Sequence, residues 1–311
     1  MSSARADDLP DFDSLWDYNN PAQTEAKFRD LLPAAEKSGD STYLAELKTQ
    51  IARTLSLQQK FDEAHAVLDE VDSAIAVEKA RAGSAGASPS QEHWDRIRVR
   101  YLLERGRTFN SAKQKDKALP LFEDAWNLAS GAGFDAYAVD AAHMLAIAAP
   151  PEQVMEWNQR ALVLAEKSSE PKARKWRGSL FNNIGWDYFS QSKYDSALDM
   201  FEQAVRARIE QEQPAEVRVA KWCVAKTLRM MGQVDSALVM QQMLEIEWRD
   251  SDEGPDGYVF EEIAECLLAL DRAGNAAPYF AQAYELLSKD PWLQRDEPER
   301  LARLKKLGRV E

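Results

Sequence analysis

The chain has 311 residues, of which 45% are hydrophobic and 29% charged, and its formal net charge is −13 at pH 7. Such a charge repels nucleic-acid phosphates and anionic lipid head groups, so it argues against nucleic-acid and membrane-surface binding. The start of the chain shows no apolar leader, and no run of about eighteen apolar residues indicates a membrane span, so we expect a cytoplasmic protein.

Residues 1–10 are polar and are expected to be disordered, whereas residues 11–308 are expected to form one domain. The domain begins with a shortened helical pattern, in which Phe12 and Trp16 precede Thr24 and Phe28. A stretch rich in glycine, alanine and serine at 82–91 predicts a flexible loop.

Six pairs of amphipathic helices are predicted after this first segment, because small and large apolar residues recur at helical spacing. The first helix of each pair carries a small residue where the two helices would cross, which we call the crossing residue. The crossing residues are Ala52, Gly106, Ala142, Gly185, Ala225 and Ala264. The second helices begin near Ala64, Ala118, Val154, Ala197, Ala237 and Ala276, separated by between 36 and 54 positions.

The clearest pair spans 181–205. Gly185 and Tyr188 share one face of the first helix, and Ala197, Phe201 and Ala204 share one face of the second. Glycine or alanine at a crossing lets two helix axes approach to about 8–10 Å, while large residues fill the flanks.

This pattern resembles the tetratricopeptide repeat (TPR), whose period is about 34 residues. The resemblance implies an all-α, right-handed superhelix of about six helix pairs, with an N-terminal partial unit and a capping helix from Glu297 to Leu307. The whole chain resembles stand-alone TPR proteins of bacteria, a group that implies no activity. It departs from the pattern at Asn158 and Gln241, where large apolar residues are expected.

Catalytic motifs and metal-ligand spacings are absent from the sequence, so we expect no enzyme, no cofactor and no metal. Cys223 and Cys266 are expected to be reduced, buried thiols. The acidic cluster at 261–265 is expected to be solvated surface, with an acidic end to a ligand groove as the alternative.

In TPR proteins the first helices line the concave side, so positions one after, three before and four after each crossing residue are expected to face a groove. From these positions we select a basic and aromatic set as the predicted binding site: Arg53, Arg107, Asn110, His143, Asn182, Trp186, Trp222, Lys226 and Arg229. The same rule places Thr49, Leu103, Val139, Ser56 and Ala146 in the groove.

Arginine can hold a carboxylate through two parallel hydrogen bonds, asparagine can hold a peptide group, and tryptophan supplies apolar area. The leading hypothesis is therefore a non-catalytic scaffold or adaptor that binds an acidic peptide or protein segment. The opposite interpretation is that Trp186 and Trp222 are packing residues and that the cations pair with neighbours such as Glu104 and Asp140.

Three alternatives stay open. One is a TPR regulator that senses a peptide or metabolite. A second, least favoured, is an enzyme built on Asp140 and His143, which lie three residues apart on one predicted helix. Self-association through an uncovered end or Trp157 would make the protein a homo-oligomer.

Overall fold

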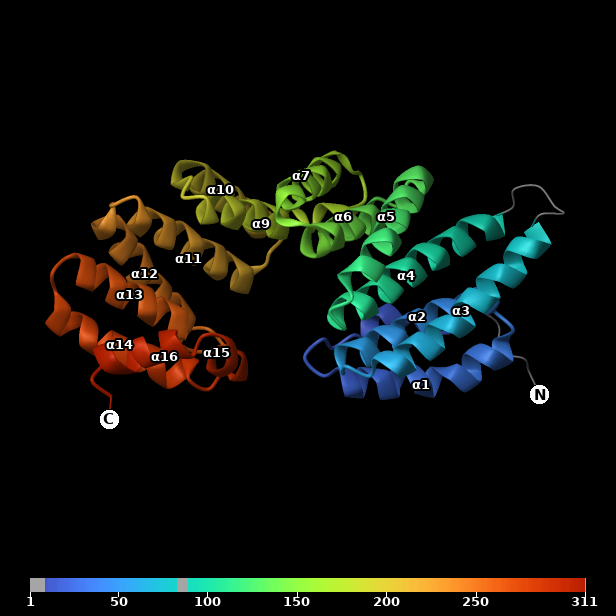
Figure 1. Ribbon diagram of the computed structural model, residues 1–311, viewed down its shortest axis with the longest axis horizontal. Coiled ribbons are helices and arrows are strands. Elements are labelled where there is room, and N and C mark those ends of the chain that lie inside the picture. The colour runs from blue at the N-terminus through green and yellow to red at the C-terminus, as the bar shows by residue number, and fades with distance from the viewer. Residues whose placement is uncertain (1–8, 83–88, 311) are drawn as a thin grey trace. The chain divides into compact units, whose positions relative to one another are not determined.

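A computed structural model describes residues 9–82 and 89–310, and every regular element within these ranges is a helix (Figure 1). The all-α prediction is confirmed. The predictions of disorder for residues 1–8 and of a flexible loop for residues 83–88 lie outside the described residues. Residues 89–91, which the prediction included in the loop, belong instead to α4, which begins at Pro89.

The helices fall into two compact units, Met1–Trp176 and Arg177–Glu311, which we call the N-terminal and C-terminal units. That residues 11–308 behave as one domain stays a prediction. The N-terminal unit contains η2 (Phe12–Leu15), α1 (Pro21–Ser38), α2 (Ser41–Leu57), α3 (Phe61–Ala82), α4 (Pro89–Ser111), α5 (Lys115–Ala132), α6 (Asp135–Ala148), α7 (Pro151–Lys167) and α8 (Pro171–Arg174).

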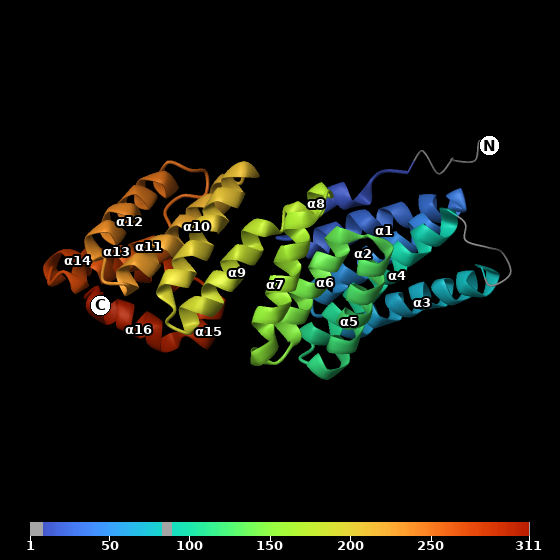
Figure 2. The ribbon, with the colours of Figure 1, turned by 90° about the horizontal axis from the view of Figure 1, so that it is seen from above.

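The C-terminal unit repeats the arrangement with three helix pairs and two terminal helices. Its elements are α9 (Arg177–Ser190), α10 (Tyr194–Glu210), α11 (Pro214–Met230), α12 (Val234–Arg249), α13 (Gly257–Ala269), α14 (Ala273–Leu287), α15 (Pro291–Asp296) and α16 (Pro298–Leu307). In both units, helices consecutive in sequence pack side by side, as α3 and α4 do (Figure 2). The predicted capping helix is α16, whereas α8 and α15 are short helices that the sequence pattern did not predict.

Five of the helix pairs close through the same tight turn. In each, one residue takes a left-handed conformation with φ between 58° and 82°: Gln59, Lys113, Ser192, Gly232 and Asp271. The next backbone N–H then donates to a carbonyl five residues earlier, as Lys193 N does to Tyr188 O over 3.0 Å. This bond satisfies a carbonyl that the helix end leaves unpaired, so the first helix stops at the same place in each pair.

The crossing glycines are required by close packing. A Cβ atom added to Gly106 would lie 2.5 Å from the ring of Phe122, and one added to Gly185 would lie 2.6 Å from the ring of Phe201. Both phenylalanines are fully buried. The second helix therefore inserts a ring into the space that a missing Cβ leaves.

The two polar departures from the repeat pattern are both buried. Asn158 on α7 is 3% exposed, and Gln241 on α12 is fully buried. Neither the Asn158 Oδ1 nor the two amide heteroatoms of Gln241 form a hydrogen bond with the described residues. The amides occupy the core sites of the expected aromatic residues without polar partners.

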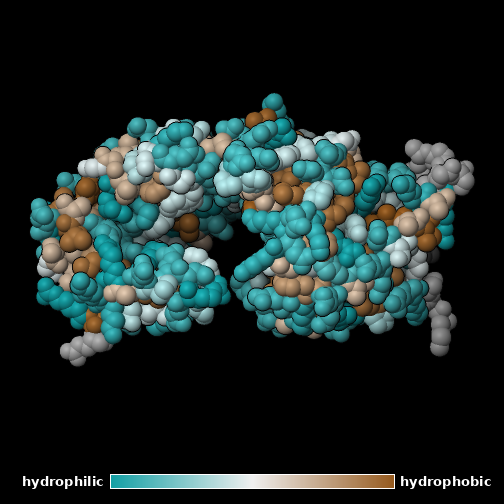
Figure 3. Space-filling model, viewed as in Figure 1, coloured by the Kyte–Doolittle hydropathy of each residue, from teal (hydrophilic) through white to brown (hydrophobic). Residues whose placement is uncertain are grey.

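Hydrophilic residues cover most of the visible face of each unit, and apolar residues form small groups among them (Figure 3). Within the described ranges, no helix has both the length and the apolar character to span a bilayer.

Candidate functional site

A polar pocket of about 730 Å³ lies among the first helices of the N-terminal unit, α2, α4 and α6, and reaches to η2 and α8. Its charged lining is balanced, because five carboxylates lie among five cations. The carboxylates are Asp13, Glu46, Glu104, Asp140 and Glu170, and the cations are Arg53, Arg96, Arg100, Arg107 and Lys172.

Arg107 lies at the centre of this network. Its Nη1 donates to Glu104 Oε1 over 2.6 Å, and its Nη2 donates to Asp140 on the next first helix. Burial alone would lower the pKa of Arg107, but the two carboxylates raise it. The guanidinium is therefore permanently charged and already holds two anions.

Arg100, two helical turns earlier on α4, also binds two carboxylates. It donates to Glu46 over 3.0 Å and to Asp13 over 2.7 Å, which joins α4 to α2 and to η2. Arg96 donates to the other oxygen of Glu46 over 2.7 Å.

Arg53 differs from these arginines. Its only ion pair within the described residues is a contact of 3.5 Å between Nη1 and Glu104 Oε2, and that oxygen has no hydrogen-bond partner there. Burial lowers the pKa of Arg53, and repulsion from Arg107 lowers it further. Arg53 is thus a partly buried cation, with 24% of its side chain exposed at the pocket, whose donors are not used by a close partner.

Aromatic side chains border the pocket. Trp16 stacks on Tyr18 with ring centroids 4.6 Å apart, and its Nε1 donates to Gln50 over 3.0 Å. Across the pocket lining, Trp176 packs against His143 with centroids 5.1 Å apart. The pocket therefore offers flat apolar faces beside its charges.

In the C-terminal unit the predicted cations converge on a buried carboxylate. Glu262 on α13 is 2% exposed, and it accepts hydrogen bonds from Lys226 Nζ over 2.5 Å and from Arg229 Nε over 2.8 Å. Burial raises the pKa of Glu262, but the two cations outweigh burial and hold it below its usual value.

The expectation that the cluster at 261–265 is solvated surface was wrong for two of its members. Glu261 and Glu262 are 8% and 2% exposed. Glu261 accepts from Arg300 of the capping helix α16, and Glu265 accepts from Arg303. The carboxylates are thus used for pairing between helices, which the sequence spacing did not reveal.

The aromatic and amide residues predicted for this unit pack against each other. Trp186 lies 5.3 Å from Phe201 and 6.1 Å from Trp222, measured between ring centroids. Trp222 Nε1 donates to the carbonyl of Tyr258 over 3.1 Å, and the Cys223 thiol donates to Asn182 Oδ1 over 3.5 Å. These contacts match the packing interpretation of the tryptophans.

Comparisons with known proteins identify one repeat. The sequence model of the tetratricopeptide repeat matches residues 178–210, which cover most of α9 and all of α10. These residues form a tetratricopeptide repeat, and the chain as a whole is similar in fold to TPR proteins. The match falls on the clearest predicted pair, in which Phe201 packs onto Gly185. No curated protein matches the sequence.

Several solved structures are similar to this chain. A Signal Transduction ATPase with Numerous Domains from Pyrococcus horikoshii, which carries a TPR sensor, has a TM-score of 0.67 at 12% identity over 92% of this chain and 44% of its own. This chain thus spans less than half the length of that protein. NprR in complex with its cognate peptide NprX has a TM-score of 0.51 at 15% identity, over 98% of this chain and 84% of its own. A TPR protein from Parabacteroides merdae has a TM-score of 0.48 at 16% identity, over 94% and 98% of the two chains.

The nine predicted site residues divide between the two units. Arg53 and Arg107 line the N-terminal pocket, and His143 adjoins it through Trp176. Asn110 lies beyond the pocket lining, and its buried Oδ1 accepts no hydrogen bond from the described residues. The other five residues belong to the C-terminal unit.

Part of the rule that selected groove positions was wrong. The positions three before the crossing residue, Thr49 and Val139, are fully buried, and Leu103 is 1% exposed at the pocket floor. Ser56 and Ala146, four after it, are also buried. The pocket is instead lined two positions before the crossing residue, by Gln50, Glu104 and Asp140. Each residue turns a helix by about 100°, so an error of one position moves a side chain to another face.

Sequence reasoning missed Glu46 and Arg100, which line the pocket together. Each lies seven positions before a residue that was selected, Arg53 or Arg107, and seven residues are close to two full helical turns. Extending the predicted face by two turns toward the N-terminus would have found both.

The residues considered as catalytic candidates contact other residues of the fold. Asp140 accepts from Arg107, and burial lowers the pKa of His143. Cys223 and Cys266 are free and buried, as expected, and burial raises the pKa of each thiol to about 12. No group of three or more metal-ligating side chains occurs in the part of the chain that the structure describes.

Proposed function

We propose that this TPR protein is a non-catalytic interaction module whose N-terminal pocket binds an acidic peptide or protein segment. The observation that carries the proposal is that the guanidinium of Arg53 has no close hydrogen-bond partner among the described residues. It is a partly buried guanidinium whose one ion pair within the described residues is a 3.5 Å contact. A ligand carboxylate could take two parallel hydrogen bonds from it and offset the cost of its burial.

The neighbouring charges favour Arg53 over the other cations as the anchor. Arg107 and Arg100 already hold two carboxylates each. Lys172 on the short helix α8 is exposed at the pocket and has no ion-pair partner among the described residues. A second acidic group of the ligand would therefore meet Lys172, while the Trp16 and Trp176 faces would contact its apolar parts.

For the C-terminal unit we assign the predicted residues to packing. Lys226 and Arg229 both bond to Glu262, so an acidic ligand would compete with a carboxylate that is already buried and hydrogen-bonded. NprR, which is similar in fold, was solved in complex with its cognate peptide NprX, and this supports peptide recognition as the general role.

The test uses fluorescein-labelled tetrapeptide libraries in which acidic residues alternate with small and aromatic ones, with matched libraries of the corresponding amides. We expect the acidic pool alone to raise the fluorescence anisotropy on addition of protein. We expect Arg53→Met to weaken binding by at least about tenfold, since a charged hydrogen bond is lost.

The matched control is Arg160→Met, which removes an exposed arginine of α7 that pairs with Glu156 outside the pocket. This variant should bind like the wild type. Equal binding of the acidic and amide pools, or unchanged binding by folded Arg53→Met, would refute the proposal.

A second candidate is a sensor, in which a small peptide or metabolite in the pocket alters a further interaction. The similar ATPase carries a TPR sensor, and the pocket volume of about 730 Å³ suits a compact ligand. Hydrogen exchange separates the two functions. A sensor should show ligand-induced protection beyond α2, α4 and α6, whereas a simple binding module should show protection only at the pocket.

A further inference from the structure

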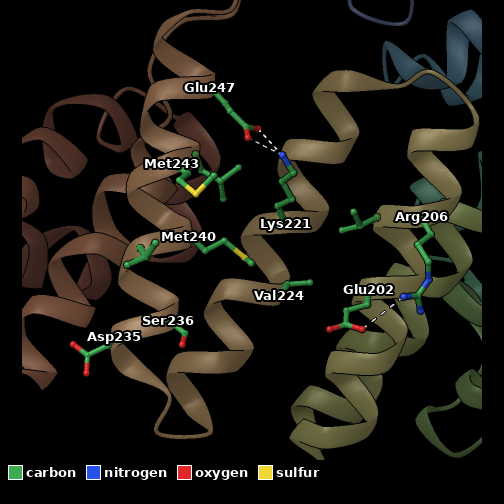
Figure 4. A pocket seen from close by; sticks show the side chains of 12 residues that line it. Glu202, Arg206, Lys221, Val224, Asp235, Ser236, Met240, Met243 and Glu247 are labelled. Carbon is green, nitrogen blue, oxygen red and sulfur yellow. Dashed lines mark hydrogen bonds and ion pairs between the residues drawn. The ribbon is translucent and has the colours of Figure 1, made fainter.

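An apolar groove lies in the C-terminal unit between the second helices α10 and α12, and α11 forms its floor (Figure 4). Its volume is about 690 Å³, and its apolar lining comes from Val205, Val224, Val239, Met240, Met243 and Leu244. Val239 and Met243 are 57% and 58% exposed. None of these residues belongs to the pocket of the N-terminal unit, so the groove is independent of the proposed function.

The N-terminal unit shows how an equivalent groove is closed. Between α5 and α7, Trp126 and Trp157 meet edge to face with ring centroids 5.8 Å apart. In the repeat register, Trp126 stands four after the buried Phe122, as Val205 stands four after Phe201. Trp157 stands three after the opening residue Val154, as Met240 stands three after Ala237.

The next pair in the C-terminal unit carries larger side chains at these positions. There Glu245 and Tyr279 occupy the two equivalent positions, and burial and the nearby Glu245 carboxylate raise the pKa of Tyr279. Among these three pairs of second helices, α10 and α12 carry the smallest apolar side chains at the two equivalent positions, namely Val205 and Met240. The groove therefore contains empty space where aromatic rings would fit, and the side chains of its walls lack the dispersion contacts that such rings would make.

The rim of the groove is acidic, because its cations are already paired with rim carboxylates. Lys221 bonds Glu247 over 2.7 Å, and Arg206 lies 3.8 Å from Glu202, as the dashed lines in Figure 4 show. Both rim cations are thus paired. Asp235 is exposed and has no ion-pair partner among the described residues. Together with a chain charge of −13, this favours a basic occupant.

The walls of the groove also select the backbone conformation of the occupant. Helices satisfy their own N–H and C=O groups, so α10, α11 and α12 present no row of free backbone groups to an extended peptide. A helical occupant satisfies its own backbone and needs only an apolar face. Methionine side chains adapt to such a face, because they are unbranched and flexible.

We propose that this groove binds an amphipathic helix of a partner protein, which inserts a tryptophan or phenylalanine between Val205 and Met240 and places lysine or arginine beside Asp235. The partner helix completes the packing that Trp126 and Trp157 provide within the N-terminal unit. The groove is therefore a second interaction surface, separate from the acidic-ligand pocket.

The probe is a stapled helical peptide with one tryptophan on an apolar face flanked by lysines. Two matched peptides replace the tryptophan by alanine or the lysines by glutamates. Binding is followed by anisotropy, and its place by the ¹³C-methyl spectrum of the protein's methionines. We expect the first peptide to shift the Met240 and Met243 signals and to bind at least about tenfold more tightly than either matched peptide.

The double variant Val205→Trp/Met240→Trp should fill the groove and abolish binding, whereas Val163→Trp, an exposed site on α7, should leave it unchanged. If the double variant does not fold, Met243→Lys at the exposed lip tests the same point through charge repulsion, and binding should fall at least about tenfold. Arg53→Met should have no effect on this peptide, so failure here is separable from failure of the proposed function.

Three results would overturn the inference. The first is that the methionine signals do not move at saturating peptide. The second is that the glutamate-flanked peptide binds as tightly as the lysine-flanked one. The third is self-association in sedimentation velocity that Val205→Trp/Met240→Trp abolishes, because the occupant would then be a second copy of this chain.

Discussion

Lys226 on α11 forms an ion pair of 2.5 Å with Glu262 on α13, which connects the first helices of two consecutive repeats. The same relation occurs twice in the N-terminal unit, where Arg53 faces Glu104 and Arg107 pairs with Asp140. In each case a cation one position after a crossing residue meets a carboxylate two positions before the next one. These inner charges therefore hold neighbouring helix pairs together.

Removing Glu262 should destabilise the C-terminal unit. In Glu262→Gln, two cations lose their shared counter-charge. We expect a loss of about 2 kcal/mol, less than for a fully buried pair, because Lys226 and Arg229 are 21% and 18% exposed. The measurement is urea unfolding followed by circular dichroism.

The matched control is Glu253→Gln, which removes a solvent-exposed partner of Arg218 and should leave the unfolding midpoint almost unchanged. Replacing Glu262, Lys226 and Arg229 together by methionine should recover most of the loss, because no uncompensated charge is left. A Glu262→Gln variant as stable as the wild type would show that the pair contributes nothing.

The crossing glycine of the clearest repeat is expected to be intolerant of a side chain. Gly185→Ala places a Cβ atom 2.6 Å from the Phe201 ring, so the helices must move apart at a cost of about 1–3 kcal/mol. Gly131→Ala on α5 has no atom within 4 Å and should be neutral or stabilising. Equal thermal midpoints for the two variants would contradict the packing explanation.

Gln241 is a site where stability can be gained. Its buried amide has no hydrogen-bond partner among the described residues, and methionine has a similar shape without polar atoms. We expect Gln241→Met to raise the free energy of unfolding by about 1–2 kcal/mol. Gln242→Met, at the exposed neighbouring position of α12, should have almost no effect. A destabilised Gln241→Met would imply that the amide makes favourable contacts.

The stability of the N-terminal unit should fall in mild acid. Burial lowers the pKa of His143 from 6.5, and Arg107 lowers it further, against the opposing effect of Asp140. The native state thus favours the neutral imidazole, so stability is complete above the unfolded pKa of 6.5 and is lost as pH falls below it.

His143→Gln should therefore flatten the dependence of the unfolding midpoint on pH between about pH 7.5 and 5.5. Burial also lowers the pKa of His65, so His65→Gln should flatten a separate part of the curve, and the double variant should flatten it most. An unchanged slope in His143→Gln would show that this imidazole does not titrate on unfolding.

The sequence predicted the helix pairs because their signals are local. Small residues such as Gly185 and large ones such as Phe201 recur at helical spacing, and the structure places them in contact as expected. The predicted binding residues were harder to judge. Lys226 and Arg229 were recognised as inner-face cations, but their carboxylate was assigned to solvated surface, because sequence distance does not show that α13 brings Glu262 to them.

By itself, the sequence determined the all-helical repeat, the crossing positions and the buried thiols, since each depends on spacing along one or two consecutive helices. Only the tertiary structure decided which cations are paired, that Arg53 is the least satisfied of the pocket arginines, and that Val205 and Met240 leave a groove that Trp126 and Trp157 close elsewhere. These properties depend on distances between side chains of different repeats. A shift of one position moves a side chain to another face of its helix and so changes these distances, although the repeat pattern stays the same.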